Sequence, residues 1–112
     1  MSDQLQNLHT IIETLPQGLR SHLYRTQQVG SRLASRFGVN QDKVMLATLG
    51  HDIYRAASPQ QLLDEAILLG ISIDPIEMRV PILLHGALAA ARLQRDCRIN
   101  DKEILEAVRW HS

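Results

Sequence analysis

The stretch Gly50-His51-Asp52-Ile53-Tyr54-Arg55 follows directly on an apolar run, Val44-Met45-Leu46-Ala47-Thr48-Leu49. Burying an unpaired charge next to a core segment is unfavourable, so His51 and Asp52 need partners. A divalent cation is one such partner, because neutral imidazole nitrogens and carboxylate oxygens both ligate metals. Adjacent residues of a helix point about 100° apart, so both side chains could bind one ion only where the helix meets a cavity. Taken alone, the dipeptide is more typical of a helix end than of a metal site.

Composition places this dipeptide in one α-helical domain. The 112 residues suffice for a single core, and the 45% hydrophobic but only 4% aromatic content is typical of helices packed through aliphatic side chains. Lys plus Arg and Asp plus Glu balance at 12 each, which argues against nucleic acid or an anionic membrane as partner. The single Cys97 fits a reducing compartment. The chain shows neither a signal peptide nor an apolar run of about 18 residues, so we expect a cytoplasmic protein that does not span a membrane.

The spacing of apolar residues and helix-ending signals predicts about five to six helices and no strand. The helices are expected over residues 2–15, 19–37, 41–55, 59–69, 81–98 and 101 to the end, with a loop at 71–79. Asn40, Ser58 and Asp101 or Asn100 are candidate N-caps, and Gly38 is a candidate C-cap. On the second helix, Leu19, His22, Thr26, Val29 and Leu33 form the expected core-facing stripe. The fold class predicted is all-α.

Four predicted helices each carry one histidine on the side expected to face the core. These residues are His22, His51, His85 and His111, whereas His9 lies at the edge of its apolar stripe and is expected at the surface. A single buried histidine is usually satisfied by a backbone carbonyl. Four imidazoles and Asp52 in one small core would need several independent partners, and one or two metal ions satisfy them together. A bundle whose histidines are only structural is the remaining alternative.

Four segments of the chain resemble the HD-domain phosphohydrolases, a superfamily with a His…His-Asp…Asp pattern on a helical bundle. They are residues 22–34 (HLYRTQQVGSRLA), 47–55 (ATLGHDIYR), 83–91 (LLHGALAAA) and 99–111 (INDKEILEAVRWH). Within the superfamily, the chain is most similar to the bacterial YqeK-type symmetrical dinucleoside tetraphosphate hydrolases. The resemblance divides the chain into an N-terminal helix at 1–18 and an HD domain at 19–112.

The resemblance implies a centre of two divalent metals, with iron expected and manganese or magnesium as alternatives. His22, His51 and Asp52 would bind the first metal, Asp52 would bridge to the second, and His85 and His111 would complete the second site. A metal-bound hydroxide would then split diadenosine tetraphosphate into two ADP molecules. Asp52 and Arg55 are the implied catalytic residues. Arg55 and Arg25 are candidate contacts to substrate phosphates, and Thr26 is expected to fill the core.

One defining feature of the superfamily, an Asp ligand on a later helix, would lie beyond Ser112. We therefore expect an HD domain that is C-terminally incomplete relative to the family. This leaves a second hypothesis, a catalytically impaired HD module that binds metal or nucleotide as a regulatory or interaction domain. Apolar surface left uncovered by such a shortening would make a homodimer plausible.

Overall fold

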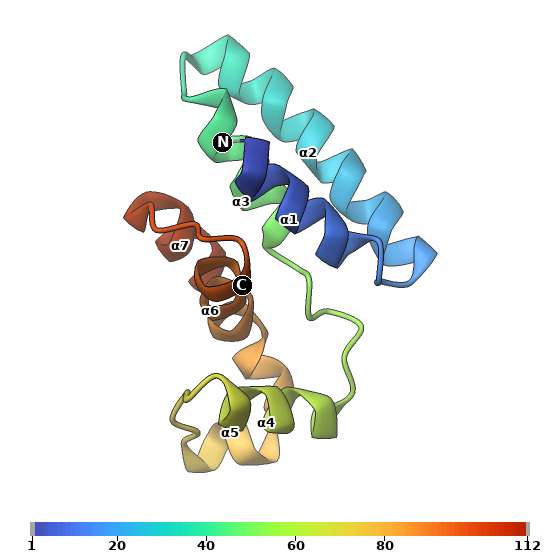
Figure 1. Ribbon diagram of the computed structural model, residues 1–112, viewed down its shortest axis with the longest axis vertical. Coiled ribbons are helices and arrows are strands. Elements are labelled where there is room, and N and C mark those ends of the chain that lie inside the picture. The colour runs from blue at the N-terminus through green and yellow to red at the C-terminus, as the bar shows by residue number, and fades with distance from the viewer. Residues whose placement is uncertain (1, 112) are drawn as a thin grey trace.

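The computed structural model describes residues 2–111 and confirms the all-α fold class (Figure 1). Among these residues there is no strand; the chain forms seven α-helices and one 3-10 helix. In chain order they are α1 (Ser2–Ile12), α2 (Gln17–Phe37), α3 (Gln41–Gly50), α4 (Pro59–Leu68), α5 (Pro75–Arg79), η1 (Pro81–Leu84), α6 (His85–Asp96) and α7 (Lys102–Arg109). No helix in this part of the chain is long and apolar enough to cross a membrane.

The predicted N-caps of α3, α4 and α7 and the predicted C-cap of α2 are confirmed by their local geometry. The Asn40 side chain accepts from the Lys43 N–H, and Asp101 accepts from the N–H groups of Glu103 and Ile104. Ser58 forms a capping box with Gln61, and Pro59 occupies the first helical position. Gly38 ends α2 in the left-handed conformation, with φ 69°.

The segment after α4 differs from the prediction. We expected a loop at residues 71–79, but Pro75–Arg79 forms a short helix, because Asp74 and Glu77 make a second capping box around Pro75. We also expected an α-helix from Pro81, but Pro81–Leu84 is a 3-10 helix and α6 begins only at His85. Ile82 lies in this tighter turn and is exposed.

Helix α3 is shorter than predicted. It ends at Gly50, and residues 51–56 form turns instead of continuing to Arg55. After Gly50 the backbone bonds reach back only three residues, from Arg55 N–H to Asp52 O and from Ala57 N–H to Tyr54 O. His51 itself keeps helical dihedrals, with φ −66° and ψ −31°, and Asp52 follows it in these turns.

The core is formed by α1, α2, α3, α6 and α7 together with side chains of α4 and η1, and α3 contacts α1, α2, α6 and α7. Its fully buried side chains include Leu8, Ile12, Leu23, Leu49, Leu62, Leu84, Leu88, Leu93, Ile99 and Val108. The predicted stripe of α2 is wrong beyond its first two turns. Val29 and Leu33 are about half exposed, whereas Ala34 is buried and Gly30 packs closely against Val44 and Thr48 of α3, so another face of this part of α2 meets the core.

Helices α3 and α7 are joined at both ends. At their starts, Lys43 Nζ lies 3.1 Å from Asp101 Oδ2. Just beyond their ends, the rings of His51 and His111 lie 5.0 Å apart, centroid to centroid. The two helices therefore run side by side in the same direction and deliver their last residues to one place.

Gly86 permits the close packing of α6 against α7. A Cβ atom at this position would collide with the backbone carbonyl of Arg109, which cannot rotate away as a side chain can. A Cβ at Gly18, in the first turn of α2, would meet nothing within 4 Å.

We expect Gly86→Ala to lower the free energy of unfolding by about 1–3 kcal/mol, the usual cost of overpacking. Gly18→Ala should be neutral or stabilise by at most about 1 kcal/mol, because it removes only unfolded-state freedom. Urea unfolding followed by circular dichroism measures both. Equal stabilities for the two variants would show that α6 and α7 can separate without penalty.

Candidate metal centre

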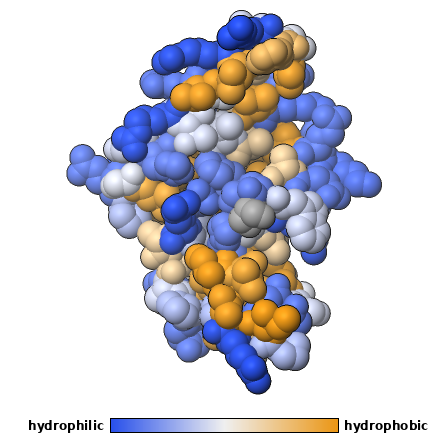
Figure 2. Space-filling view, turned by 180° about the vertical axis from the view of Figure 1, so that it is seen from behind, coloured by the Kyte–Doolittle hydropathy of each residue, from blue (hydrophilic) through white to orange (hydrophobic). Residues whose placement is uncertain are grey.

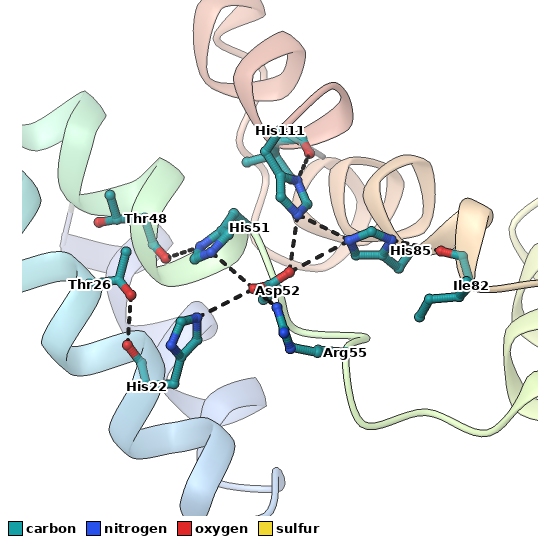
Figure 3. A network of polar contacts seen from close by, with 10 residues as sticks. His22, Thr26, Thr48, His51, Asp52, Arg55, Ile82, His85 and His111 are labelled. Carbon is teal, nitrogen blue, oxygen red and sulfur yellow. Dashed lines mark hydrogen bonds and ion pairs between the residues drawn. The ribbon is translucent and has the colours of Figure 1, made fainter.

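The site is centred on Asp52, which is buried with only 3% of its surface exposed. Its two carboxylate oxygens face different histidines (Figure 3). Oδ2 lies 3.1 Å from His51 Nε2 and 3.4 Å from His22 Nε2. Oδ1 lies 3.0 Å from His111 Nε2 and 3.6 Å from His85 Nε2. The single carboxylate is thus shared by two pairs of imidazoles.

These five residues come from four separate parts of the fold. His22 lies in the second turn of α2, and His51 and Asp52 lie directly after α3. His85 is the first residue of α6. His111 was predicted on the last helix, but α7 ends at Arg109 and His111 follows outside it. Its ring turns back toward the carbonyl of Val108, in the last turn of α7.

Three of the histidine rings are held by the same kind of hydrogen bond to the backbone. Nδ1 of each ring donates to the carbonyl three residues earlier: His51 to Thr48 (2.6 Å), His85 to Ile82 (2.7 Å) and His111 to Val108 (2.5 Å). A carbonyl oxygen only accepts, so the proton of each neutral ring resides on Nδ1. Nε2 is left with a free lone pair directed toward Asp52, which is how supporting hydrogen bonds orient metal-binding histidines.

Apart from the Arg55 guanidinium at its edge, the resulting cluster contains acceptors without donors. His85 Nε2 lies 3.1 Å from His111 Nε2, and both face Asp52 Oδ1. His22 Nε2 is also buried and has no hydrogen-bond partner. Neutral imidazole nitrogens and a carboxylate at these distances repel one another unless a proton or a cation lies between them. The donor set therefore fits a divalent metal.

The protonation states that ligation requires are also those the surroundings favour. Burial lowers the pKa of His51, and the neighbouring His111 and His22 lower it further, which keeps the ring neutral. Burial by itself raises the pKa of Asp52. Attraction to a proton taken up by His51 or His111, and the hydrogen bond from Arg55, outweigh that effect, so the net pKa of Asp52 is below the usual range. Asp52 is accordingly a carboxylate.

Two groups of three ligands can each hold one ion. One comprises His22, His51 and Asp52; the other comprises Asp52, His85 and His111. The ligand atoms within each group all lie within 4.8 Å of one another. The structure thus brings together all five residues predicted as ligands and divides them as the resemblance implied. Their role in metal binding stays a prediction.

The cluster forms the floor of an open cavity of about 670 Å³. Arg55 lies at its edge, mostly exposed, and its Nη1 donates to Asp52 Oδ2 at 3.2 Å. Ile82 also lines the cavity, and the sequence analysis did not identify it as a site residue. The only available signal was its position three residues before His85, the same spacing that Thr48 and Val108 have from their histidines.

The other residues considered from the sequence lie around this cavity. Arg25 is exposed on α2 and is not among the residues lining the cavity. Thr26 is half-buried and donates to the carbonyl of His22 at 2.8 Å. His9 is exposed on α1, as expected, with its ring edge-on to Tyr24. Arg25 remains a predicted phosphate contact.

The HD domain family matches residues 19–112, which include all five clustered residues. The chain belongs to the HD domain family. It is also similar to two curated proteins named "Bis(5'-nucleosyl)-tetraphosphatase, symmetrical". The protein from Bacillus subtilis is 28% identical over 91 residues, covering 81% of this chain and 48% of its own length. The Staphylococcus aureus protein is 27% identical over 109 residues, covering 89% of this chain and 51% of its own.

The chain therefore spans about half the length of the curated relatives it matches. No solved structure matches it significantly.

We expect metal to stabilise this HD domain. Addition of Mn²⁺, or of Fe²⁺ without oxygen, at about 100 times the dissociation constant should raise the free energy of unfolding by roughly 2.7 kcal/mol. For a domain of this size, that raises the melting temperature by about 10 °C. Differential scanning fluorimetry after chelation and reloading measures the shift.

Asp52→Asn should largely abolish this shift, because an amide cannot supply two anionic oxygens. His9→Asn, which changes a histidine outside the cluster, should keep it. An equal shift in wild type and Asp52→Asn would mean that the ion binds elsewhere.

Proposed function

We propose that this HD domain is a metal-dependent phosphohydrolase that cleaves dinucleoside polyphosphates, converting diadenosine tetraphosphate symmetrically into two ADP molecules. The observation that carries the proposal is the sharing of the buried Asp52 carboxylate between two pairs of histidines whose Nε2 lone pairs all face it. The names of the two curated relatives supply the substrate class.

The residues that would hold the two ions are His22, His51 and Asp52 for one, and Asp52, His85 and His111 for the other. Imidazole-rich sets suit iron, zinc and related metals better than magnesium, which prefers oxygen ligands. We therefore infer iron as the resident metal. Bound there, two cations supply Lewis acidity, which activates water and withdraws negative charge from a phosphoryl group.

The protein's own residues contribute position and charge. The three Nδ1–carbonyl bonds fix the ring planes, so the Nε2 atoms need not reorganise when substrate binds. Arg55 is mostly exposed and bonds Asp52 through one nitrogen, so its remaining N–H donors are available to phosphate oxygens. Its planar guanidinium can bind two oxygens at once, which aligns a polyphosphate chain across the cluster.

The test is hydrolysis of diadenosine tetraphosphate by the metal-loaded chain, with nucleotides separated by ion-exchange chromatography. We expect ADP as the only product, because cleavage at the central bridge divides the molecule equally. Asp52→Asn should reduce kcat at least about 1,000-fold, because it disrupts both metal sites together, while His9→Asn stays active.

ATP and AMP as products would contradict symmetrical cleavage. Metal-loaded protein that binds the nucleotide without cleaving it would instead identify a binding module.

Arg55 can be tested separately from the metals. We expect Arg55→Ala to lower kcat/KM about 10- to 100-fold, as loss of a charge-assisted phosphate contact does. Arg55→Lys should fall between wild type and Arg55→Ala, because lysine keeps the charge but loses the planar fork. Metal content should not change in either variant.

Arg32→Ala, an exposed arginine farther along α2, serves as the charge-matched control and should retain wild-type kinetics. Unchanged kcat/KM in Arg55→Ala would remove this residue from the site.

A further inference from the structure

The cavity above the histidines contains one apolar side chain. Its lining consists of the four histidines, Asp52, Arg55 and Ile82. Figure 3 shows the Ile82 side chain below the His85 ring, on the side of Asp52 where Arg55 also lies. The open side of the cavity thus has a guanidinium at one position and an aliphatic surface at another.

Ile82 is held rigidly in this place. Its own carbonyl accepts the Nδ1 proton of His85 at 2.7 Å, so residue and ligand are fixed together. Leu84, two residues on, is completely buried, and the Leu83 N–H bonds the Val80 carbonyl at 3.1 Å. Ile82 is nevertheless 45% exposed. The Ile82 side chain therefore lies in contact with water, at the edge of a charged cavity.

The apolar surface continues outward from Ile82. Met78, Val80 and Leu83 are each about half exposed on α5, η1 and the residue between them. The lower half of Figure 2 shows apolar surface gathered on this part of the molecule. A ligand that covers exposed apolar surface gains roughly 25 cal/mol of binding free energy for each Å² that it removes from water.

We propose that Ile82 is the contact for the nucleobase of the substrate, which binds by its flat face rather than by its hydrogen-bonding edge. This inference rests on the proposed function, because it takes the phosphates to lie over the histidines and Arg55. A nucleotide anchored there directs its ribose and base out of the cavity along the open side. The base is the one part of the molecule with an apolar face that matches an isoleucine side chain.

This contact determines which nucleotides the site accepts. An isoleucine side chain offers neither donor nor acceptor, so it cannot distinguish the edge pattern of adenine from that of guanine. Discrimination between nucleotides then depends on how much of the flat face of the base the isoleucine side chain covers. Adenine and guanine nucleotides should therefore bind alike, and pyrimidine nucleotides more weakly.

The experiment compares equilibrium binding of ADP and inorganic pyrophosphate to the metal-loaded protein by isothermal titration calorimetry. Both ligands carry a diphosphate, and only ADP carries a base. We expect Ile82→Ser to weaken ADP binding about 10- to 20-fold, from the loss of about two buried CH₂ groups, and to leave pyrophosphate binding unchanged. Ile82→Met restores an apolar surface and should bind ADP as wild type does. GDP should match ADP within about threefold.

Leu33→Ser is the matched control, because Leu33 is an isomer of isoleucine, is 50% exposed and lies on α2 outside the cavity lining. It should change neither affinity. Metal content and melting temperature of each variant establish that the site is intact.

Equal losses for ADP and pyrophosphate in Ile82→Ser, or no loss for either, would overturn the base contact while leaving the phosphohydrolase proposal standing. Failure of wild type to bind either ligand and to cleave diadenosine tetraphosphate would overturn both. A dimer in sedimentation velocity that Ile82→Ser dissociates would assign the apolar surface to a second copy of the chain instead.

Discussion

The structure depends on one buried carboxylate. Asp52 has four imidazoles around it, and they arrive from α2, from the end of α3, from the start of α6 and from beyond α7. A negative charge with so little exposure is unfavourable in an aliphatic core unless positive charge compensates it. In this fold, Arg55 supplies one such charge from the solvent side, and the histidines supply lone pairs that only a cation or a proton can satisfy. The core and the site therefore depend on the same helices, because the helices that bury Asp52 also carry the histidines that surround it.

The helices around Asp52 are arranged to keep the two halves of this cluster in register. Lys43 and Asp101 join the starts of α3 and α7, and Gly86 lets α6 lie against the end of α7. The exposed ion pair contributes little stability. The N-caps Asn40 and Asp101 set where the two helices begin, and the ion pair holds these two starts side by side.

Much of this fold could be predicted from the sequence because helix starts are local. Asn40, Ser58 and Asp101 bond backbone N–H groups within three residues of themselves, so their role can be recognised from neighbouring residues alone. The end of α3 is different. The chain leaves the helix at Gly50, and Asp52 then lies against His85 and His111, which come from distant parts of the chain. The convergence of the histidines was predictable from their helical positions and from the family resemblance. The exposure of Ile82 was not, because it depends on a 3-10 turn whose geometry apolar spacing does not encode.

The histidine supports consist of main-chain carbonyls at positions 48, 82 and 108. A carbonyl is present whichever side chain the residue carries. The orientation of the three rings is therefore insulated from most amino-acid replacement at those positions, and the side chains there are free to take other tasks. Under the proposed base contact, substrate preference could change through the side chain at residue 82 while the His85 ring keeps its orientation. Alanine scanning would not detect these carbonyl–Nδ1 hydrogen bonds, because an alanine substitution leaves the main-chain carbonyl in place. Only replacements that alter the backbone itself, such as proline within the preceding turn, would reveal how much they contribute.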